Sequence, residues 1–192
     1  MNQNIEIKIL RQHWVIDNGE YDRADLCSHG KLFLRIGDEI LSDENSKTWA
    51  LSATGLYLLR TLKSDYTIKD FGNFLVPCCA HLIIPDDHIN HVDIFGCSHG
   101  LDWNIRHEDG NVIYTSEKGS TGKVTFEEYK DMVLNFTDQL ELFYGDPNEK
   151  IVPFDEMEQN GFKQFWLEWN ELKNEWRTPK NKAFTRELFS VA

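Results

Sequence analysis

The sequence contains few cysteines, little positive charge and no long apolar run. It has four cysteines among 192 residues. Near the N-terminus, Glu6, Lys8 and Arg11 interrupt the apolar residues, so this segment does not read as a secretory signal peptide. No apolar stretch approaches the roughly 20 residues that a membrane-spanning helix needs. We therefore expect a cytoplasmic protein whose cysteines are reduced thiols.

The balance of charge is acidic. The chain carries 32 acidic and 20 basic side chains, and its formal net charge is −12. Non-specific binding to nucleic acid or to anionic membranes depends on Lys and Arg, so this balance argues against both. The same charge favours a basic protein partner.

The length and composition predict one folded domain. A chain of 192 residues that is 41% hydrophobic can bury a core without disulfide or metal staples. No long linker interrupts the pattern, so we predict a single domain over residues 1–192. Lys180, Lys182 and Arg186 lie in residues 178–192, which we expect to form a basic tail that is flexible or docks on a partner.

Alternating apolar residues predict strands over much of the first 125 residues. The expected strands cover residues 5–16, 31–41 and 48–51 in the N-terminal third, and 80–84, 91–95, 101–107, 111–116 and 122–125 in a later meander. Turn residues separate the later strands, and Asp109-Gly110 is the strongest hairpin signal among them. Residues 101–107 place apolar side chains on one face and polar ones on the other, which indicates an antiparallel sheet covered on one side.

Apolar residues at spacings of three and four predict three helices. Ser52 is expected to cap the first helix, over residues 53–63. Thr125 and Glu128 form a capping box for the second, and the third covers residues 155–176. The order of elements predicts an α+β fold: an antiparallel multi-stranded meander with one internal helix and two C-terminal helices packed on one face.

The tetrapeptide Cys-Ser-His-Gly occurs twice, at residues 27–30 and 97–100. In an extended segment a Cys and a His two residues apart point to the same side, and two such pairs would offer the thiolates and imidazoles that zinc accepts. The predicted zinc ligands are Cys27, His29, Cys97 and His99. Common zinc sites use longer spacings within each pair. In the alternative interpretation each copy ends a strand, and Gly30 and Gly100 adopt positive φ in turns.

Two further groups carry side chains that bind metals. Cys79 and His81 share a strand face and would extend the first site, although burial in the core is the simpler role for Cys78 and Cys79. His88 and His91 lie among acidic residues and could bind a divalent ion. A solvated polar loop is the simpler interpretation of that segment.

No motif identifies a catalytic group. Residues 118–123 superficially resemble a phosphate-binding loop, but the first glycine and the Ser or Thr that binds magnesium are replaced. A nucleophile elbow, a Rossmann glycine pattern and a zinc-protease motif are absent. The catalytic residues are therefore unknown from the sequence, which favours a role other than catalysis, and zinc is the one cofactor that the residues suggest.

The last predicted helix is rich in aromatic residues. Trp166, Trp169 and Trp176 recur along it at helical spacing. Core packing is the simpler role for them. Tryptophan is also enriched among the residues that anchor interfaces, so these three are candidate partner-binding residues, and the helix could dock a protein partner or a second copy of the chain.

Several segments in order along the chain resemble an uncharacterised family of small bacterial cytoplasmic proteins. They are residues 27–30, 35–39, 49–62, 75–81, 96–103, 126–129 and 162–169. The resemblance spans residues 24–176 and implies a bacterial origin and a single domain. It implies no activity and no catalytic residue.

Three functions of different classes follow from these patterns. The first is an acidic protein-interaction domain, such as an immunity or antitoxin-like inhibitor of a basic partner, whose charge would speed association. The second is a metal-binding enzyme or sensor that uses the Cys and His pairs. The third is a homodimeric protein that associates through its last helix.

Overall fold

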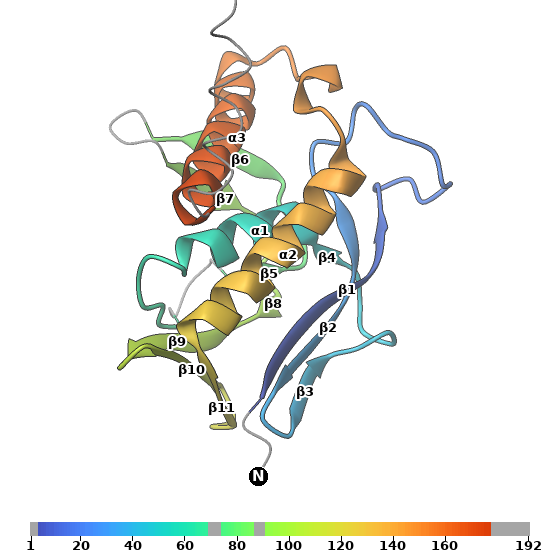
Figure 1. Cartoon of the computed structure of the whole chain (residues 1–192). Helices are drawn as coiled ribbons and strands as arrows, with labels where there is room; N and C mark the ends of the chain where they lie inside the picture. Colours follow the sequence, from blue (N-terminus) through green and yellow to red (C-terminus); the bar gives the residue numbers. More distant parts are fainter. Residues whose placement is uncertain (1–3, 69–73, 87–90, 178–192) are drawn as a thin grey trace, which may run out of the picture.

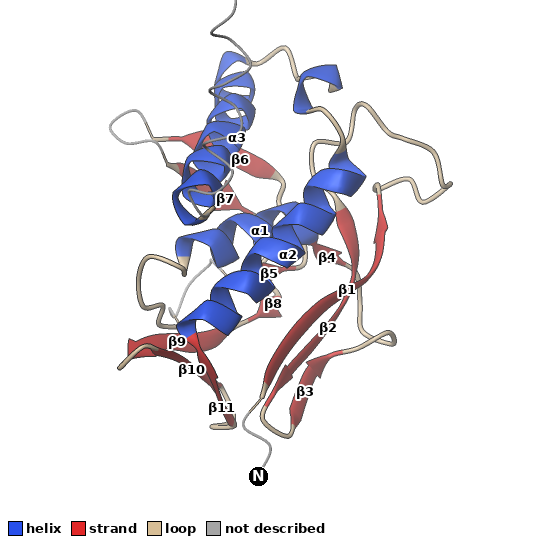
Figure 2. Ribbon diagram, in the orientation of Figure 1, coloured by secondary structure: helices blue, strands red, loops and turns tan. Residues whose placement is uncertain are grey.

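A computed structural model describes residues 4–68, 74–86 and 91–177, and these residues form an α+β fold (Figure 2). Within these ranges there are three α-helices, one internal and two C-terminal, as the sequence predicts. The helices are α1 (Leu51–Arg60), α2 (Phe126–Tyr144) and α3 (Glu156–Trp176), and a short 3-10 turn, η1 (Pro147–Glu149), precedes α3. Among the described helices none is both long and apolar enough to cross a membrane.

The strands pair antiparallel, but they divide into four groups instead of one continuous meander (Figure 1). The N-terminal sheet contains β1 (Ile5–His13), β2 (His29–Ile36), β3 (Glu39–Ser42) and β4 (Trp49–Ala50). A second sheet contains β9 (Trp103–Glu108), β10 (Asn111–Ser116) and β11 (Thr121–Thr125). Two short pairs complete the set: β5 (Val76–Pro77) with β8 (Gly100–Leu101), and β6 (Leu82–Pro85) with β7 (Val92–Phe95).

The N-terminal sheet has one hairpin more than the sequence analysis predicts. Strand β2 alternates partly buried and buried side chains, which fits a strand with one face in the core. The predicted strand over 31–41 breaks at Gly37, whose φ is 58°, and β3 returns along β2 immediately afterwards. Glycine reaches positive φ without a steric penalty, so the chain turns here, inside the single strand predicted over 31–41.

Helix α1 is a buried core helix and does not have the predicted cap. It begins at Leu51, its N-cap residue is Ala50, and no side chain caps it. Ser52 lies inside the helix, and its hydroxyl accepts the Ser28 N–H at 2.7 Å and lies 2.9 Å from the Ser28 hydroxyl. The prediction of a Ser52 cap is therefore wrong, because the hydroxyl bonds to Ser28, the residue before β2, instead of to the helix terminus.

The two C-terminal helices begin within one residue of the predicted positions. The Thr125–Glu128 capping box is present at the start of α2. The Asp155 side chain caps α3 by accepting the Glu158 N–H. The Asp109-Gly110 turn is also confirmed, since both residues have positive φ and join β9 to β10. Local polar contacts decide these features, so local sequence predicts them.

The largest core cluster surrounds α1, which contacts α2, α3, β2 and β5. Helix α2 crosses beside it, while α3 packs beside the β6–β7 pair (Figure 1). A Cβ at Gly55 of α1 would lie 2.5 Å from the Trp169 ring and 2.6 Å from Leu140 Cδ1. The three helices therefore approach closely at a position where only glycine fits without displacement.

Candidate functional site: a cysteine cluster beside a pocket

Three of the four cysteines meet where two short strand pairs join. On one side of them β5 pairs with β8, and on the other side β6 pairs with β7. Between the two pairs, the Cys78 N–H donates to the His99 carbonyl at 3.0 Å and the His81 N–H donates to the Phe95 carbonyl at 2.8 Å. Residues 78–81 are therefore held against residues 95–99 by backbone hydrogen bonds.

The sulfur atoms of the three cysteines form one group. Cys78 and Cys97 form a disulfide, and Cys79 Sγ lies 3.7 Å from Cys78 Sγ. The backbone N–H of Cys97 donates to Cys79 Sγ at 2.9 Å. All three sulfur atoms lie within 4.8 Å of one another. We call Cys78, Cys79 and Cys97 the cysteine cluster.

Gly96 permits the close approach that brings the cluster together. A Cβ on this residue would lie 2.2 Å from the Cys79 carbonyl oxygen and 3.5 Å from Cys79 Sγ. A contact of 2.2 Å with a backbone oxygen is prohibitive, so the chain needs a residue without a side chain here. No local sequence signal marks Gly96, because the approach is between segments separated along the chain.

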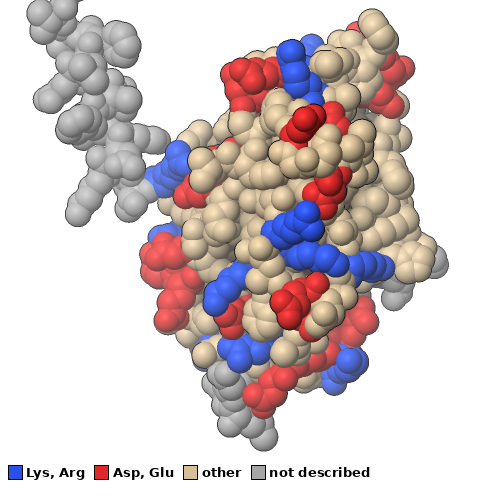
Figure 3. Space-filling model, turned by 90° about the vertical axis from the view of Figure 1, so that its right-hand side faces the viewer, with Lys and Arg blue, Asp and Glu red and all other residues tan. Residues whose placement is uncertain are grey.

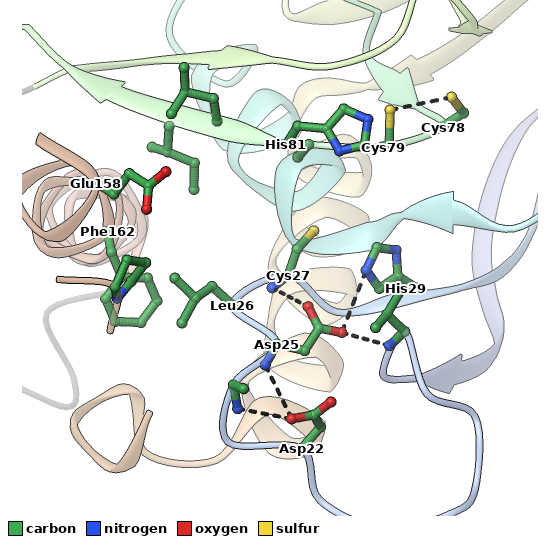
Figure 4. Close-up of a pocket in the computed structure, with 16 residues that line it drawn as sticks. Asp22, Asp25, Leu26, Cys27, His29, Cys78, Cys79, His81, Glu158 and Phe162 are labelled. Carbon is green, nitrogen blue, oxygen red and sulfur yellow. Dashed lines mark hydrogen bonds and ion pairs between the residues drawn. The ribbon is translucent and has the colours of Figure 1, made fainter. Parts of the chain in front are cut away.

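The cluster borders a pocket of about 610 Å³ (Figure 4). Cys78 and Cys79 line it from one side, and helix α3 contributes Glu158 and Phe162. The other lining residues are Val15, Asp22, Ala24, Asp25, Leu26, Cys27, His29, Ala80, His81, Leu82, Ile83 and Pro153. The loop before β2, the cysteine segment and α3 thus meet around one cavity, and a small molecule in it would reach Cys79.

Asp25 and His29 form a polar pair on the wall of this pocket. His29 Nε2 lies 3.6 Å from an Asp25 carboxylate oxygen, and that carboxylate also accepts the backbone N–H groups of Val15 and Cys27 at 2.6 and 3.0 Å. Burial raises the pKa of Asp25, but the hydrogen bonds from His29 and from the backbone together lower it by more. The net pKa of Asp25 therefore lies below its usual value. Asp25 therefore remains a carboxylate and orients His29.

Cys27 lines the same pocket but lies outside the cysteine cluster. Its side chain is buried, and burial raises the pKa of the Cys27 thiol to about 12, an effect to which the charge of Asp25 adds. The thiolate is the form that attacks disulfides and binds metals. Cys27 thus stays a protonated, unreactive thiol at neutral pH.

The structure does not bring the four predicted zinc ligands together. Among the residues that the structure describes, the one group of at least three metal-ligating atoms is the cysteine cluster, which contains Cys97 but not Cys27, His29 or His99. Cys27 and His29 line the pocket, and His99 is exposed. The two copies of the tetrapeptide therefore do not converge on one ion here, because they pair with different strands.

The alternative interpretation of the repeat is only half right. Both copies lie at a strand terminus, but each leads into the start of a strand, β2 or β8, instead of ending one, and neither Gly30 nor Gly100 has a positive φ. A Cβ at Gly30 would lie 2.0 Å from the Arg11 carbonyl, and one at Gly100 would lie 2.2 Å from the Phe74 ring. Close contact with a neighbouring segment, and not turn geometry, requires glycine at both positions.

The remaining candidate residues have other surroundings. His91 Nδ1 lies 3.3 Å from Glu168 of α3, whereas His88 lies outside the described residues. Trp169 is fully buried, while Trp166 packs on Tyr144 and Trp176 packs on Phe126. Trp169 presents no surface to a partner, whereas Trp166 and Trp176 are partly buried and stay candidate partner-binding residues.

The expectation of four reduced cysteines is corrected by the Cys78–Cys97 disulfide. The adjacent residues Cys78 and Cys79 are not bonded to each other. No protein-family model, curated protein or solved structure matches this chain. The site is therefore interpreted from its own geometry.

Proposed function

We propose that the protein is a thiol–disulfide switch centred on the cysteine cluster. The observation that carries this proposal is a disulfide whose sulfur atoms are in contact with a third cysteine beside an open pocket. A structural disulfide needs no third thiol within reach. A disulfide that is opened and closed by exchange does benefit from one, because exchange proceeds by attack of a thiolate on a disulfide sulfur.

Cys79 is the entry point for oxidation in this proposal. Its thiolate attacks a low-molecular-weight disulfide that enters the pocket; a mixed disulfide forms and one thiol leaves. The Cys97 thiolate then attacks Cys79 Sγ and releases the second thiol. Finally the Cys78 thiolate attacks Cys97 Sγ, and Cys79 leaves as a thiolate that takes up a proton. Two protein thiols are thereby oxidised and one external disulfide is reduced to two thiols; reduction follows the reverse order.

The geometry supports the choice of partners in these steps. The Cα atoms of adjacent residues are about 3.8 Å apart, below the range of about 4.4–6.8 Å for most disulfides. A Cys78–Cys79 disulfide is thus disfavoured, and Cys97 is the sulfur that each of the two can bond. Cys79 is only partly buried, so an external reagent can reach it.

The compartment predicted from the sequence agrees with a switch. In the reducing cytoplasm, disulfides are usually transient and serve catalysis or redox sensing. A Cys78–Cys97 disulfide in such a protein would form under oxidising conditions and open again when thiols are restored.

Thiol trapping tests the proposal. The wild type, Cys79→Ala and Cys27→Ala would be moved between reduced and oxidised dithiothreitol, quenched with an alkylating reagent and mapped by mass spectrometry. We expect reversible Cys78–Cys97 formation in the wild type and in Cys27→Ala, the control for a pocket cysteine outside the cluster. In Cys79→Ala the rate of disulfide formation and the rate of disulfide reduction should both fall about tenfold or more, because the external reagent must then react with Cys78 or Cys97 directly. Equal rates in the two variants, or a wild type that never forms this disulfide, would overturn the proposal.

The acidic interaction domain predicted from the sequence remains a prediction. Its support is the net charge of −12. On the face shown in Figure 3, acidic and basic side chains alternate over the surface. This face therefore offers no acidic patch that favours the interaction domain over the switch. Isolation of a basic partner would support the immunity-like role.

A further inference from the structure

We infer that the reduced cysteine cluster binds one thiophilic metal ion, with Zn²⁺ as the probe, through Cys78, Cys79 and Cys97. The inference rests on the proposed switch, because the three thiols are available together only in the reduced state. This site shares only Cys97 with the four Cys and His ligands predicted from the repeat.

The distances between the sulfur atoms suit such a site. A tetrahedral zinc ion with Zn–S bonds of about 2.3 Å holds its sulfur ligands roughly 3.8 Å apart. Cys79 Sγ is already 3.7 Å from Cys78 Sγ, and the whole group lies within 4.8 Å. The sulfur atoms of Cys78 and Cys97, which are bonded to each other in the disulfide, must separate to this spacing after reduction.

The backbone holds the three cysteines together without the disulfide. The β5–β8 pair lies on one side of the cluster and the β6–β7 pair on the other. The Cys97 N–H bond to Cys79 Sγ and the Cys78 N–H bond to the His99 carbonyl add two contacts across the junction. Reduction therefore leaves three thiols close together, so metal binding does not require the segments to fold around the ion.

The donor set selects the kind of ion. Thiolates favour Zn²⁺ and Cu⁺, whereas Mg²⁺ and Ca²⁺ require oxygen ligands. Three protein ligands leave a fourth position for a zinc ion. Because Cys78 and Cys79 line the pocket, that position lies on the pocket side, where water can occupy it.

Metal binding and disulfide formation exclude each other at this site. Oxidation by a low-molecular-weight disulfide converts the Cys78 and Cys97 thiolates to the protein disulfide, consumes two protons and produces two thiols. Two of the three metal ligands are lost in that step, so the ion is released. The cluster would then report the thiol–disulfide balance as bound or free metal.

Metal titration of the reduced protein tests this inference. Protein purified without a histidine tag would be reduced with a phosphine, desalted without oxygen and titrated with Zn²⁺ against a chromophoric chelator. Substitution by Co²⁺ would report thiolate coordination through its visible spectrum. We expect one equivalent of Zn²⁺ in the wild type and in Cys27→Ala, and none in the disulfide form. Cys79→Ala should bind at least about 100-fold more weakly, because even changes outside the ligand set cost about 10–100-fold in affinity.

Thiol counting on the same samples separates the two proposals. If mass spectrometry finds the three cluster thiols free and the wild type still binds no stoichiometric zinc, the metal inference fails and the switch stands. Zinc binding that is equal in Cys79→Ala and Cys27→Ala would also overturn it. If the wild type binds zinc but never forms the Cys78–Cys97 disulfide, the redox switch fails instead. Circular dichroism of both variants establishes that they are folded.

Discussion

Arg60 and Glu168 form a two-bond ion pair that joins α1 to α3. The Arg60 Nε and Nη2 atoms donate to the two carboxylate oxygens of Glu168 at 2.7 and 2.9 Å. The Glu168 side chain is 5% exposed and also accepts the Val92 N–H at 3.0 Å. The Glu168 carboxylate thus connects the two helices with β7, and each of its two oxygens accepts at least one hydrogen bond.

Glu168→Ala is expected to destabilise the protein by about 3 kcal/mol or more. Removing one partner of a buried pair leaves the other charge without compensation, which costs about 3–5 kcal/mol. Urea unfolding would measure the change. Glu175→Ala is the matched control on the same helix, because the Lys63–Glu175 pair is about half exposed and such pairs contribute about 1 kcal/mol or less. Similar losses in the two variants would contradict the role assigned to Glu168.

Gly55→Ala is expected to destabilise the protein although alanine is the better helix former. In an exposed helix this change gains about 1 kcal/mol. Here the new methyl group would lie about 2.5 Å from Trp169 and Leu140, and overpacking a core costs about 1–3 kcal/mol. We expect a net loss of about 1 kcal/mol by chemical denaturation. Combining it with Leu140→Ala should reduce the loss due to Gly55→Ala; a stabilised single variant would disprove the close packing.

Asp102→Asn is expected to change the pH dependence of stability. Burial raises the pKa of Asp102 to about 6, although hydrogen bonds from Tyr66, Leu75 and Trp103 oppose the rise. A folded pKa above the unfolded value of 3.8 means that the stability due to this group is complete below pH 4. That stability is lost as the pH rises through 6.

Unfolding curves from pH 4 to pH 7 would measure this effect. Relative to the wild type, Asp102→Asn should gain about 2 kcal/mol over that range, since one pKa unit corresponds to about 1.4 kcal/mol. Asp65→Asn is a control of opposite sign, because hydrogen bonds from His107 lower the pKa of Asp65. The stability due to Asp65 is present above the unfolded pKa and is lost only as the pH falls through the lower folded pKa, so Asp65→Asn should be less stable than the wild type by a nearly constant amount from pH 4 to pH 7. A pH-independent difference for Asp102→Asn would refute the prediction.

Gly96→Ala is expected to disturb the cysteine cluster more than the rest of the protein. Its Cβ would meet the Cys79 carbonyl at 2.2 Å, so one of the two segments must shift. We expect disulfide exchange to slow by about tenfold or more in the alkylation experiment. Gly119→Ala is a suitable control, since its φ of +87° makes a side chain strained while nothing lies within 4 Å of the added Cβ. Equal exchange rates in both variants would show that Gly96 does not position Cys79.

Much of the fold follows from local sequence. The Thr125–Glu128 capping box and the Asp109-Gly110 turn are correctly predicted, because each depends on residues within a few positions of one another. The α+β class follows from the order of strand and helix patterns. The helix start at Leu51 is not predicted, because the Ser52 hydroxyl bonds to Ser28, 24 residues away.

The sequence by itself determined the order and type of most elements, since backbone propensity, hydrophobic period and capping act over short distances. It also marked the cysteines and histidines as the residues able to carry chemistry. Only the tertiary structure decided that Cys97 joins Cys78 and Cys79 and not Cys27. That choice depends on which strands pair and on the close approach at Gly96, where segments 17 residues apart meet because no side chain separates them.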